Sequence, residues 1–247
     1  MSTAAPLASR VLRHGGYEAA AMLRNGEQLV LAIVLPLLAL AGLVLTPLLD
    51  GYAASRIDIA APGVLALCTM STAFTGQGIA TGFDRRYGVL RFLSTTPLGK
   101  SGLIFGKACA VVVVLAVQLV VIGGAALLMG WRPDAAGLVP AALLLALGSA
   151  AFTALGLLVA GTLRPEATLA VTNLVWILLA AAGGIILPAS QLPAVAAPIV
   201  GLLPSAALGD GLRSALVEGQ FNLLSCVLLL AWAAVASLAA VRWFKWS

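Results

Sequence analysis

Charge is scarce in this chain of 247 residues. Only 9% of the residues are charged and 62% are hydrophobic, against roughly 45–50% apolar residues in a soluble domain. A soluble helical bundle of this length needs far more charge on its surface, so that class is excluded. The apolar runs reach 20 or more residues and are continuous, whereas β-barrel strands alternate. The sequence therefore predicts an all-α, polytopic membrane protein.

Histidine and paired cysteines are also lacking. The single histidine, His14, lies outside the apolar runs, which leaves no partner for an intramembrane serine hydrolase or zinc site. Cys68, Cys109 and Cys226 lie alone within apolar runs, and their spacing indicates neither a disulfide framework nor a metal site. We therefore expect no enzyme activity, no cofactor and no metal on this chain.

Ionisable residues are nearly absent from the middle of the apolar runs, where Gln118 and Asn173 are typical polar groups. A carrier driven by protons or ions normally keeps charged residues there. Residues 99–101 have the Gly-Lys-Ser end of a phosphate-binding loop, but the glycine that the full motif requires is Ser94. Lys107 and Glu166, near the ends of runs, are expected to snorkel or anchor. Any ATP chemistry is thus expected on another chain.

The apolar runs organise residues 1–247 as one transmembrane domain with six predicted spans, near residues 29–49, 59–82, 103–129, 138–163, 168–187 and 221–241. Residues 1–28 mix arginines with apolar residues as in an amphipathic interfacial helix; a disordered basic tail is the alternative. Pro36 predicts a kink in the first span unless a neighbouring helix satisfies the freed carbonyl. Residues 188–220 are apolar but interrupted by prolines, so we expect a re-entrant outer hairpin of two short helices.

The basic residues predict the orientation of these spans. Six spans place both termini in the cytoplasm, together with eleven of the fourteen basic residues, namely Arg10, Arg13, Arg24, Arg85, Arg86, Arg91, Lys100, Lys107, Arg164, Arg242 and Lys245. Only Arg56, Arg132 and Arg213 then lie outside, in agreement with the positive-inside rule. The net charge of +5 therefore indicates membrane topology, and no nucleic-acid partner is expected. Residues 242–246 are expected to anchor the last span at the inner interface.

The loop of residues 83–100, between the second and third spans, is the most distinctive polar stretch. Residues 86–92 are predicted to be helical, with an apolar face and a basic side available to water. The apolar face comprises Tyr87, Leu90 and Leu93, and the basic side Arg85, Arg86 and Arg91. Thr96-Pro97 predicts a break. A short cytoplasmic helix suits the docking of a soluble partner; the alternative is a loop whose charges only orient the protein.

The stretch from Asp84 to Leu93, followed by Thr96-Pro97-Leu98 and Gly106-Lys107, resembles the corresponding loop in the permeases of type-2 ABC exporters. Those permeases export drugs, antibiotics, polysaccharides or lipids. The likeness extends in outline to the interfacial helix, the six spans and the broken segment before the last span. The family loop often begins with glutamate, where this chain has Asp84.

This resemblance implies that the loop forms a coupling helix that docks into an ATP-binding subunit. The implied docking residues are Asp84, Arg85, Arg86, Tyr87, Gly88 and Arg91. It also implies a second permease copy, identical or related, a bacterial plasma membrane location among lipids, and ATP and Mg on the partner subunit. The apolar spans favour an amphiphilic or apolar cargo, such as a drug, an antibiotic or a lipid. A secondary carrier and a non-transporting membrane scaffold are the alternatives.

Overall fold

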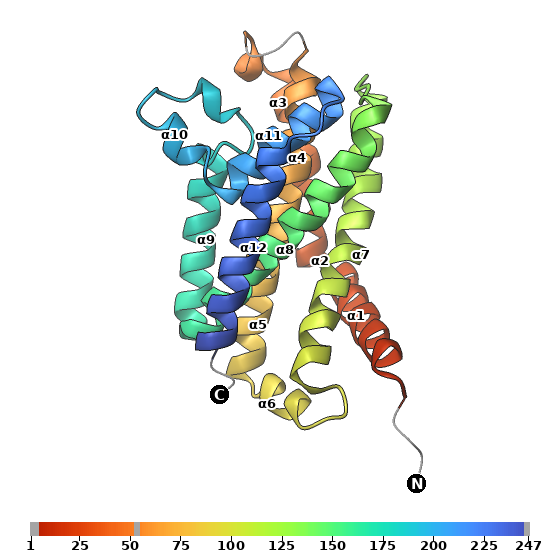
Figure 1. The fold of residues 1–247 in the computed structure, drawn as a ribbon. Coiled ribbons are helices and arrows are strands. Elements are labelled where there is room, and N and C mark those ends of the chain that lie inside the picture. Colours follow the sequence, from red (N-terminus) through yellow and green to blue (C-terminus); the bar gives the residue numbers. More distant parts are fainter. Residues whose placement is uncertain (1–4, 52–54, 245–247) are drawn as a thin grey trace.

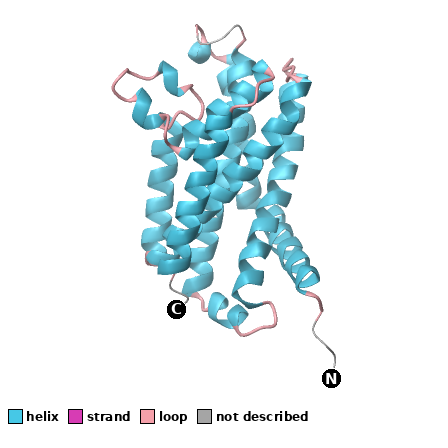
Figure 2. Ribbon diagram, in the orientation of Figure 1, coloured by secondary structure: helices cyan, strands magenta, loops and turns pink. Residues whose placement is uncertain are grey.

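A computed structural model describes residues 5–51 and 55–244, and every regular element within them is helical. Long helices run side by side along the axis of an elongated bundle (Figure 1, Figure 2). The first and last described segments lie at the same end of the bundle (Figure 1). Lys245 and Trp246 of the predicted C-terminal anchor lie outside the described residues. The expected all-α class is confirmed.

Five helices among the described residues are long and apolar enough to cross a membrane: Arg56–Arg86, Gly102–Leu128, Ala135–Thr162, Pro165–Ala182 and Leu223–Trp243. The first comprises α4 (Arg56–Met70), the π-helical segment η3 (Ser71–Gly76) and α5 (Gln77–Arg86). The others correspond to α7 (Gly99–Leu128), α8 (Leu138–Thr162), α9 (Pro165–Ala182) and α12 (Leu223–Trp243). These helices confirm a polytopic membrane protein.

The helix formed by α4, η3 and α5 is the centre of the bundle. In its most apolar stretch 89% of the residues are buried, against 11% in α9. Close approach to α8 requires glycine, because a Cβ on Gly156 would lie 2.6 Å from the Phe74 carbonyl oxygen. Small residues at such crossings let helix backbones pack tightly within a membrane.

The first predicted span is a shorter apolar helix, Val30–Leu45. It contains the π-helical turn η1 (Val30–Val34) and α3 (Leu35–Leu45), and the one-turn helix α2 (Gly26–Leu29) precedes it. Pro36 cannot donate to the carbonyl of Ala32, four residues earlier. Gln118 Nε2 of α7 donates to that oxygen at 2.7 Å, while Thr72 donates to Gln118 Oε1 at 3.0 Å. A neighbouring helix therefore satisfies the carbonyl that Pro36 leaves without its usual donor.

The segment after α9 departs from the expected boundaries. The helix ends at Ala182, five residues before the predicted end, and the chain then forms η5 (Ala189–Gln191), α10 (Ala197–Val200) and α11 (Pro204–Glu218). The first of the two expected short helices is thus a single turn, while α11 packs against α4, α8 and α12. α10 and α11 lie at the end of the bundle away from α6 (Val89–Ser94) (Figure 1).

Arg213 on α11 holds this broken segment. Its guanidinium donates to the carbonyl oxygens of Gly184, Ile185 and Ile186 at 2.9–3.0 Å and pairs with Asp210 at 2.7 Å. Arg213, expected outside the membrane in the re-entrant hairpin, is buried within the bundle, with 8% of its surface exposed. The reason is that carbonyls beyond a helix end need donors when protein surrounds them.

Candidate partner-docking site

The predicted docking residues lie where α5 meets α6, at the end of the bundle near the described termini (Figure 1). Gly88 forms the corner with a left-handed φ of +72°. The amides of Tyr87 and Gly88 donate to the carbonyls of Phe83 and Arg85 at 3.0 and 3.2 Å, as at a glycine-terminated helix end. The prediction of one helix over residues 86–92 is therefore wrong, because Gly88 divides it. The predicted break at Thr96-Pro97 is confirmed, since α6 ends at Ser94.

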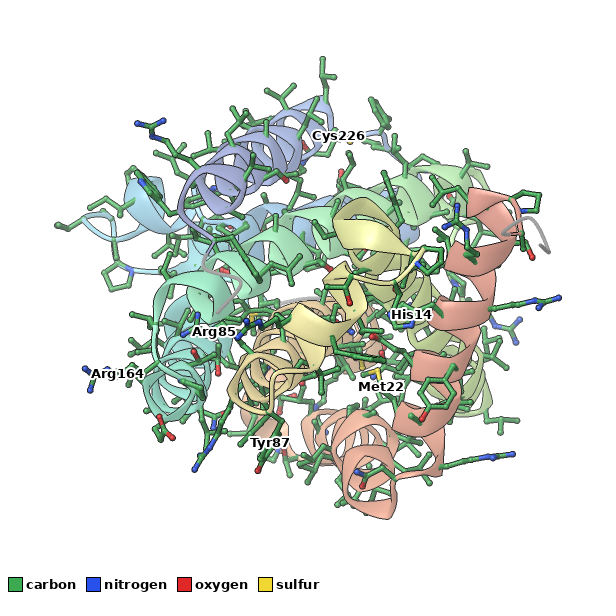
Figure 3. All side chains as sticks on the ribbon, turned by 90° about the horizontal axis from the view of Figure 1, so that it is seen from below. His14, Met22, Arg85, Tyr87, Arg164 and Cys226 are labelled. Atoms are coloured by element: carbon green, nitrogen blue, oxygen red, sulfur yellow. The ribbon has the colours of Figure 1, made fainter. Side chains whose placement is uncertain are left out.

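Arg85, expected to face water, points into the bundle. Its guanidinium donates to the carbonyl oxygens of Ala160 and Leu163, at 2.7 and 2.5 Å, at the end of α8. In the view from below (Figure 3), Arg85 lies beside the ends of the neighbouring helices. A cation placed there satisfies carbonyls that have no donor within their own helix. Arg85 thus fixes the corner to α8.

Asp84 also makes an internal contact, within a largely buried ionic cluster that joins three helices. Its Oδ2 accepts a hydrogen bond from Lys107 Nζ of α7 at 2.8 Å, and the same Nζ lies 3.1 Å from Glu18 Oε1. Glu18 belongs to α1 (Leu7–Arg24), where His14 Nε2 lies 3.1 Å from the same carboxylate oxygen. We call His14, Glu18, Asp84 and Lys107 the ionic cluster.

Lys107 does not snorkel as expected, because only 2% of its side chain is exposed. A buried ammonium loses its hydrating water, and here the two carboxylates take the place of that water as hydrogen-bond acceptors. Burial raises the pKa of Glu18, but contact with His14 and Lys107 outweighs burial and leaves this pKa below its ordinary value of 4.5. Glu18 is therefore an anion at neutral pH.

The N-terminal helix α1 packs tightly against α7 beside the ionic cluster. A Cβ on Gly15 would lie 2.7 Å from the Cβ of Cys109 and 2.8 Å from the Gly106 carbonyl oxygen. Figure 3 shows His14 on the inner side of α1. The amphipathic helix expected within residues 1–28 is thus present, and it is fastened to a membrane helix near the corner.

The remaining predicted residues face outward. We define the corner surface as the exposed residues Arg86, Tyr87, Gly88, Val89, Arg91 and Phe92. Tyr87 and Phe92 are 72% and 70% exposed, although Leu90 between them is buried, so the expected apolar face of Tyr87, Leu90 and Leu93 does not form. Exposed aromatic residues together with arginine are typical of protein interfaces.

Two neighbouring contacts order the corner surface. The Tyr87 ring stacks on the Phe83 ring, with centroids 6.3 Å apart and planes 15° apart. Arg86 Nη1 pairs with Glu166 Oε1 of α9 at 2.8 Å. Both partners of this ion pair are about half exposed or more, so its contribution to stability is about 0–1 kcal/mol. Arg86 therefore remains accessible to a second protein.

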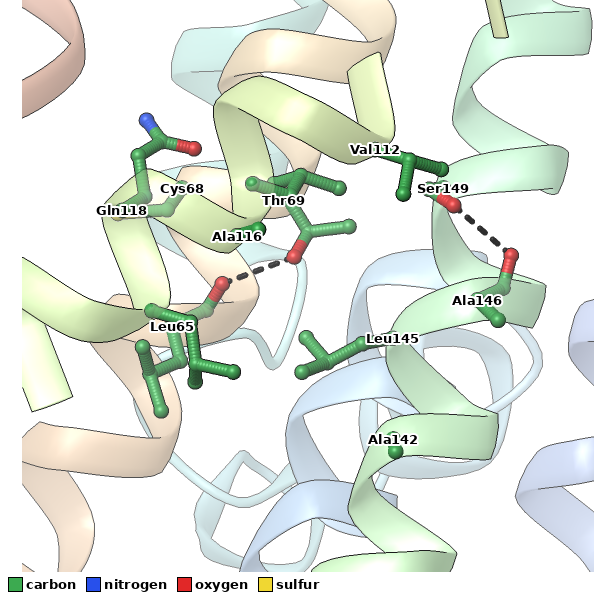
Figure 4. Close-up of a pocket in the computed structure, with 12 residues that line it drawn as sticks. Leu65, Cys68, Thr69, Val112, Ala116, Gln118, Ala142, Leu145, Ala146 and Ser149 are labelled. Atoms are coloured by element: carbon green, nitrogen blue, oxygen red, sulfur yellow. Dashed lines mark hydrogen bonds between the residues drawn. The ribbon is translucent and has the colours of Figure 1, made fainter. Parts of the chain in front are cut away.

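Among the described residues, the cavities between the helices include two that bear on ligand binding. One, of about 220 Å³, lies between α4, α7 and α8 (Figure 4). Its hydroxyls are satisfied by their own helices, since Thr69 donates to the Leu65 carbonyl at 3.0 Å and Ser149 to the Ala146 carbonyl at 2.9 Å. The other, of about 370 Å³, lies between α5, α6, α7, α8 and α12. Lys107 of the ionic cluster contributes to its wall.

Comparison with known proteins agrees with the resemblance in the loop. A family model described as "ABC-2 family transporter protein" matches residues 46–242, which is more than half of the chain. The comparison with curated proteins gives no match. Within the described residues, no three histidine, cysteine or acidic side chains gather in a way that could hold a metal ion.

Proposed function

The chain belongs to the ABC-2 family of transporter proteins, and from this membership we propose that it is the permease subunit of an ATP-driven exporter. As an ABC transporter permease it is a membrane transport subunit and not itself catalytic. In our proposal it crosses a bacterial plasma membrane six times, with Val30–Leu45 as part of the first span and both termini in the cytoplasm. The described ends at one end of the bundle support this topology (Figure 1).

The corner surface is, in this proposal, the docking site for a separate ATP-binding subunit, which carries ATP and Mg. The observation that carries the proposal is the exposure of Tyr87, which follows the end of α5, and of Phe92, which lies on the short helix α6 at the end of the bundle. Arg86 and Arg91 add positive charge beside these rings. Gly88 supplies the turn that presents them.

Asp84 and Arg85 have a different role in the proposed coupling. Arg85 ties the corner to the end of α8, and Asp84 ties it through Lys107 to α7 and, through Glu18, to α1. The corner also continues directly into the central helix of the bundle. A displacement imposed on the corner surface by an ATP-dependent partner is therefore transmitted to several helices at once. This coupling requires that the partner contact the two conformations differently.

A second permease copy and membrane lipid complete the proposed assembly. The outer faces of α3, α9 and α12 carry many exposed apolar side chains, including Leu38, Leu174, Ile177 and Leu230. Exposed apolar area of this extent marks contact with lipid or with another protein. Two permease halves would enclose a pathway lined by apolar and small residues, which suits an amphiphilic or apolar cargo such as a drug, an antibiotic or a lipid.

The docking proposal is tested by copurification in mild detergent with mass spectrometry. Wild type is expected to retain an ATP-binding ABC subunit, and Arg86→Glu is expected to lose it while still inserting in the membrane. Glu166→Gln, which breaks the same ion pair, is the matched control and should retain the subunit. The charge-swapped variant, Arg86→Glu with Glu166→Arg, restores the internal pair and should still fail to bind.

Four outcomes would count against this proposal. Retention of the subunit by Arg86→Glu, or its recovery in the charge-swapped variant, would show that Arg86 serves only its partner within the chain. Transport that stops when the proton gradient is dissipated at constant ATP would indicate a secondary carrier. A protein that copurifies no ATP-binding subunit and transports nothing would be a membrane scaffold.

A further inference from the structure

The larger cavity, of about 370 Å³, has the features of a binding site that the docking function does not use. Its wall is largely apolar, with residues such as Leu90, Leu103 and Leu157, and includes two polar side chains, Thr81 and Lys107, that are buried. Small-molecule pockets typically measure about 300–1,000 Å³ and combine apolar walls with a few polar groups. The volume lies at the low end of that range, so it suits one narrow chain.

The exposure of the lining residues indicates where the cavity opens. Ile104 of α7 is 40% exposed and Val241 of α12 is 82% exposed, so the mouth lies between these two helices on the apolar outside of the bundle. Thr81 and Leu90, which also line the cavity, are buried. Figure 1 shows α7 and α12 separated near the end of the bundle that carries α6. The cavity therefore opens on the apolar outside of the bundle, near the end that carries α6.

Thr81 is a polar group in this cavity that its own helix leaves unsatisfied. Its residue is 1% exposed, and its Oγ1 has no hydrogen-bond partner among the described residues. Thr69 and Thr172, by contrast, donate to the carbonyls four residues earlier at 3.0 and 2.7 Å, while the hydroxyl of Thr75, which does not line this cavity, also has no partner among the described residues. A buried hydroxyl without a partner is unfavourable, so Thr81 indicates a hydrogen-bonding group on the occupant.

The charged residues beside the cavity determine which kind of head group the occupant can carry. The Lys107 ammonium already contacts two carboxylates, Glu18 and Asp84, at 3.1 and 2.8 Å. An anionic head would meet these carboxylates in a low-dielectric site, and a cationic head would compete with Lys107 for them. An uncharged head that carries a hydroxyl can pair with Thr81 without disturbing the ionic cluster.

We propose that this cavity binds one alkyl chain of a membrane amphiphile whose head group is uncharged and bears a hydroxyl. The amphiphile enters between α7 and α12, and its head group hydrogen-bonds to Thr81. The apolar wall accommodates the chain, and the membrane-facing mouth supplies it directly from the bilayer. This site is formed by a single chain. It stands independently of the docking proposal.

Photolabelling of the purified protein with a monoacylglycerol that carries a diazirine in its chain tests this site. Mapped label is expected on the cavity-lining parts of α7 and α12. Ala240→Trp, which fills the cavity from α12, should abolish this label, whereas Ala142→Trp in the smaller cavity is the matched control and should not. Ser237→Trp, at the mouth, gives the same test if Ala240→Trp does not fold.

The head group is tested by competition and by Thr81→Val. Unlabelled monoacylglycerol should compete better than a fatty acid or an alkyltrimethylammonium of the same length, and Thr81→Val should weaken monoacylglycerol about fivefold, as expected for one lost hydrogen bond. Unchanged labelling in folded Ala240→Trp or Ser237→Trp would overturn the site. Stronger competition by either charged amphiphile, or unchanged affinity in Thr81→Val, would overturn the head-group assignment. Arg86→Glu, which tests docking, should leave labelling unchanged.

Discussion

Replacing Lys107 by methionine is expected to destabilise the protein through the ionic cluster. The substitution keeps most of the side-chain volume and removes the ammonium that lies 2.8 Å from Asp84 and 3.1 Å from Glu18. Two carboxylates would then face each other in a largely buried site. Removing one partner of a buried ion pair typically costs about 3–5 kcal/mol, because an uncompensated charge stays behind.

The partial exposure of the two carboxylates places the expected loss at the low end of that range. Glu18 and Asp84 keep 18% and 29% of their side-chain surface exposed, so water relieves part of the repulsion. We expect a loss of about 3 kcal/mol, which for a chain of this size corresponds to a decrease in Tm of about 6–12 °C. Thermal unfolding in one detergent, followed by intrinsic fluorescence, measures this difference.

Two further variants separate the cluster from general effects of the substitution. A triple variant, Glu18→Gln with Asp84→Asn and Lys107→Met, has no charge left to compensate and should recover most of the lost Tm. Arg13→Met, on the exposed side of α1, removes a cation without a buried partner and should stay near wild type. A Lys107→Met protein with the wild-type Tm, or a triple variant less stable than Lys107→Met, would refute this account of the cluster.

Three other predictions concern the corner, the broken segment and pH. Gly88→Ala should lower the free energy of unfolding by about 1–2 kcal/mol, because its φ of +72° is strained for alanine, and Gly88→Asn should lower it less; Tm measures both. Arg213→Met leaves three carbonyls without donors and should cost about 3 kcal/mol at about 1 kcal/mol each, with faster proteolysis at residues 183–203. Because the pKa of Glu18 is lowered in the folded protein, the ionised Glu18 carboxylate stabilises the fold fully above pH 4.5. This stabilisation is lost as the pH falls through the lowered pKa. The Tm difference between wild type and Glu18→Gln should therefore shrink on acidification below pH 4.5.

Hydropathy predicts the class and the approximate position of most spans, but it does not predict where helices end. The second span was expected over residues 59–82, whereas the helix continues to Arg86 because helical hydrogen bonds persist beyond the apolar run. The fifth span ends early, at Ala182. The backbone carbonyls of residues 184–186, which were expected to be helical, instead accept hydrogen bonds from Arg213, 27–29 positions away. Such distant donors are not visible in local hydropathy.

The position of the polar loop was predicted, and the arrangement of its residues only partly. A basic, helical loop after the second span was expected, and the structure has the short helix α6 there. The sequence could not separate inward from outward residues, because Asp84 and Arg85 contact groups 23–78 positions away. Lys107 was predicted to be a charge at the end of a span because its two partners, Glu18 and Asp84, are also distant in the sequence. One signal was available, since Gly88 within a predicted helix is a possible helix end.

Site-specific photocrosslinking from position 87 tests the docking claim most directly. A benzophenone amino acid in place of Tyr87 is expected to crosslink to an ATP-binding ABC subunit in membranes, identified by mass spectrometry. The same amino acid in place of Leu128, which is 91% exposed at the far end of α7, should yield no such product. Equal crosslinking from both positions, or products with lipid alone at position 87, would contradict the assignment of the corner surface as the docking site.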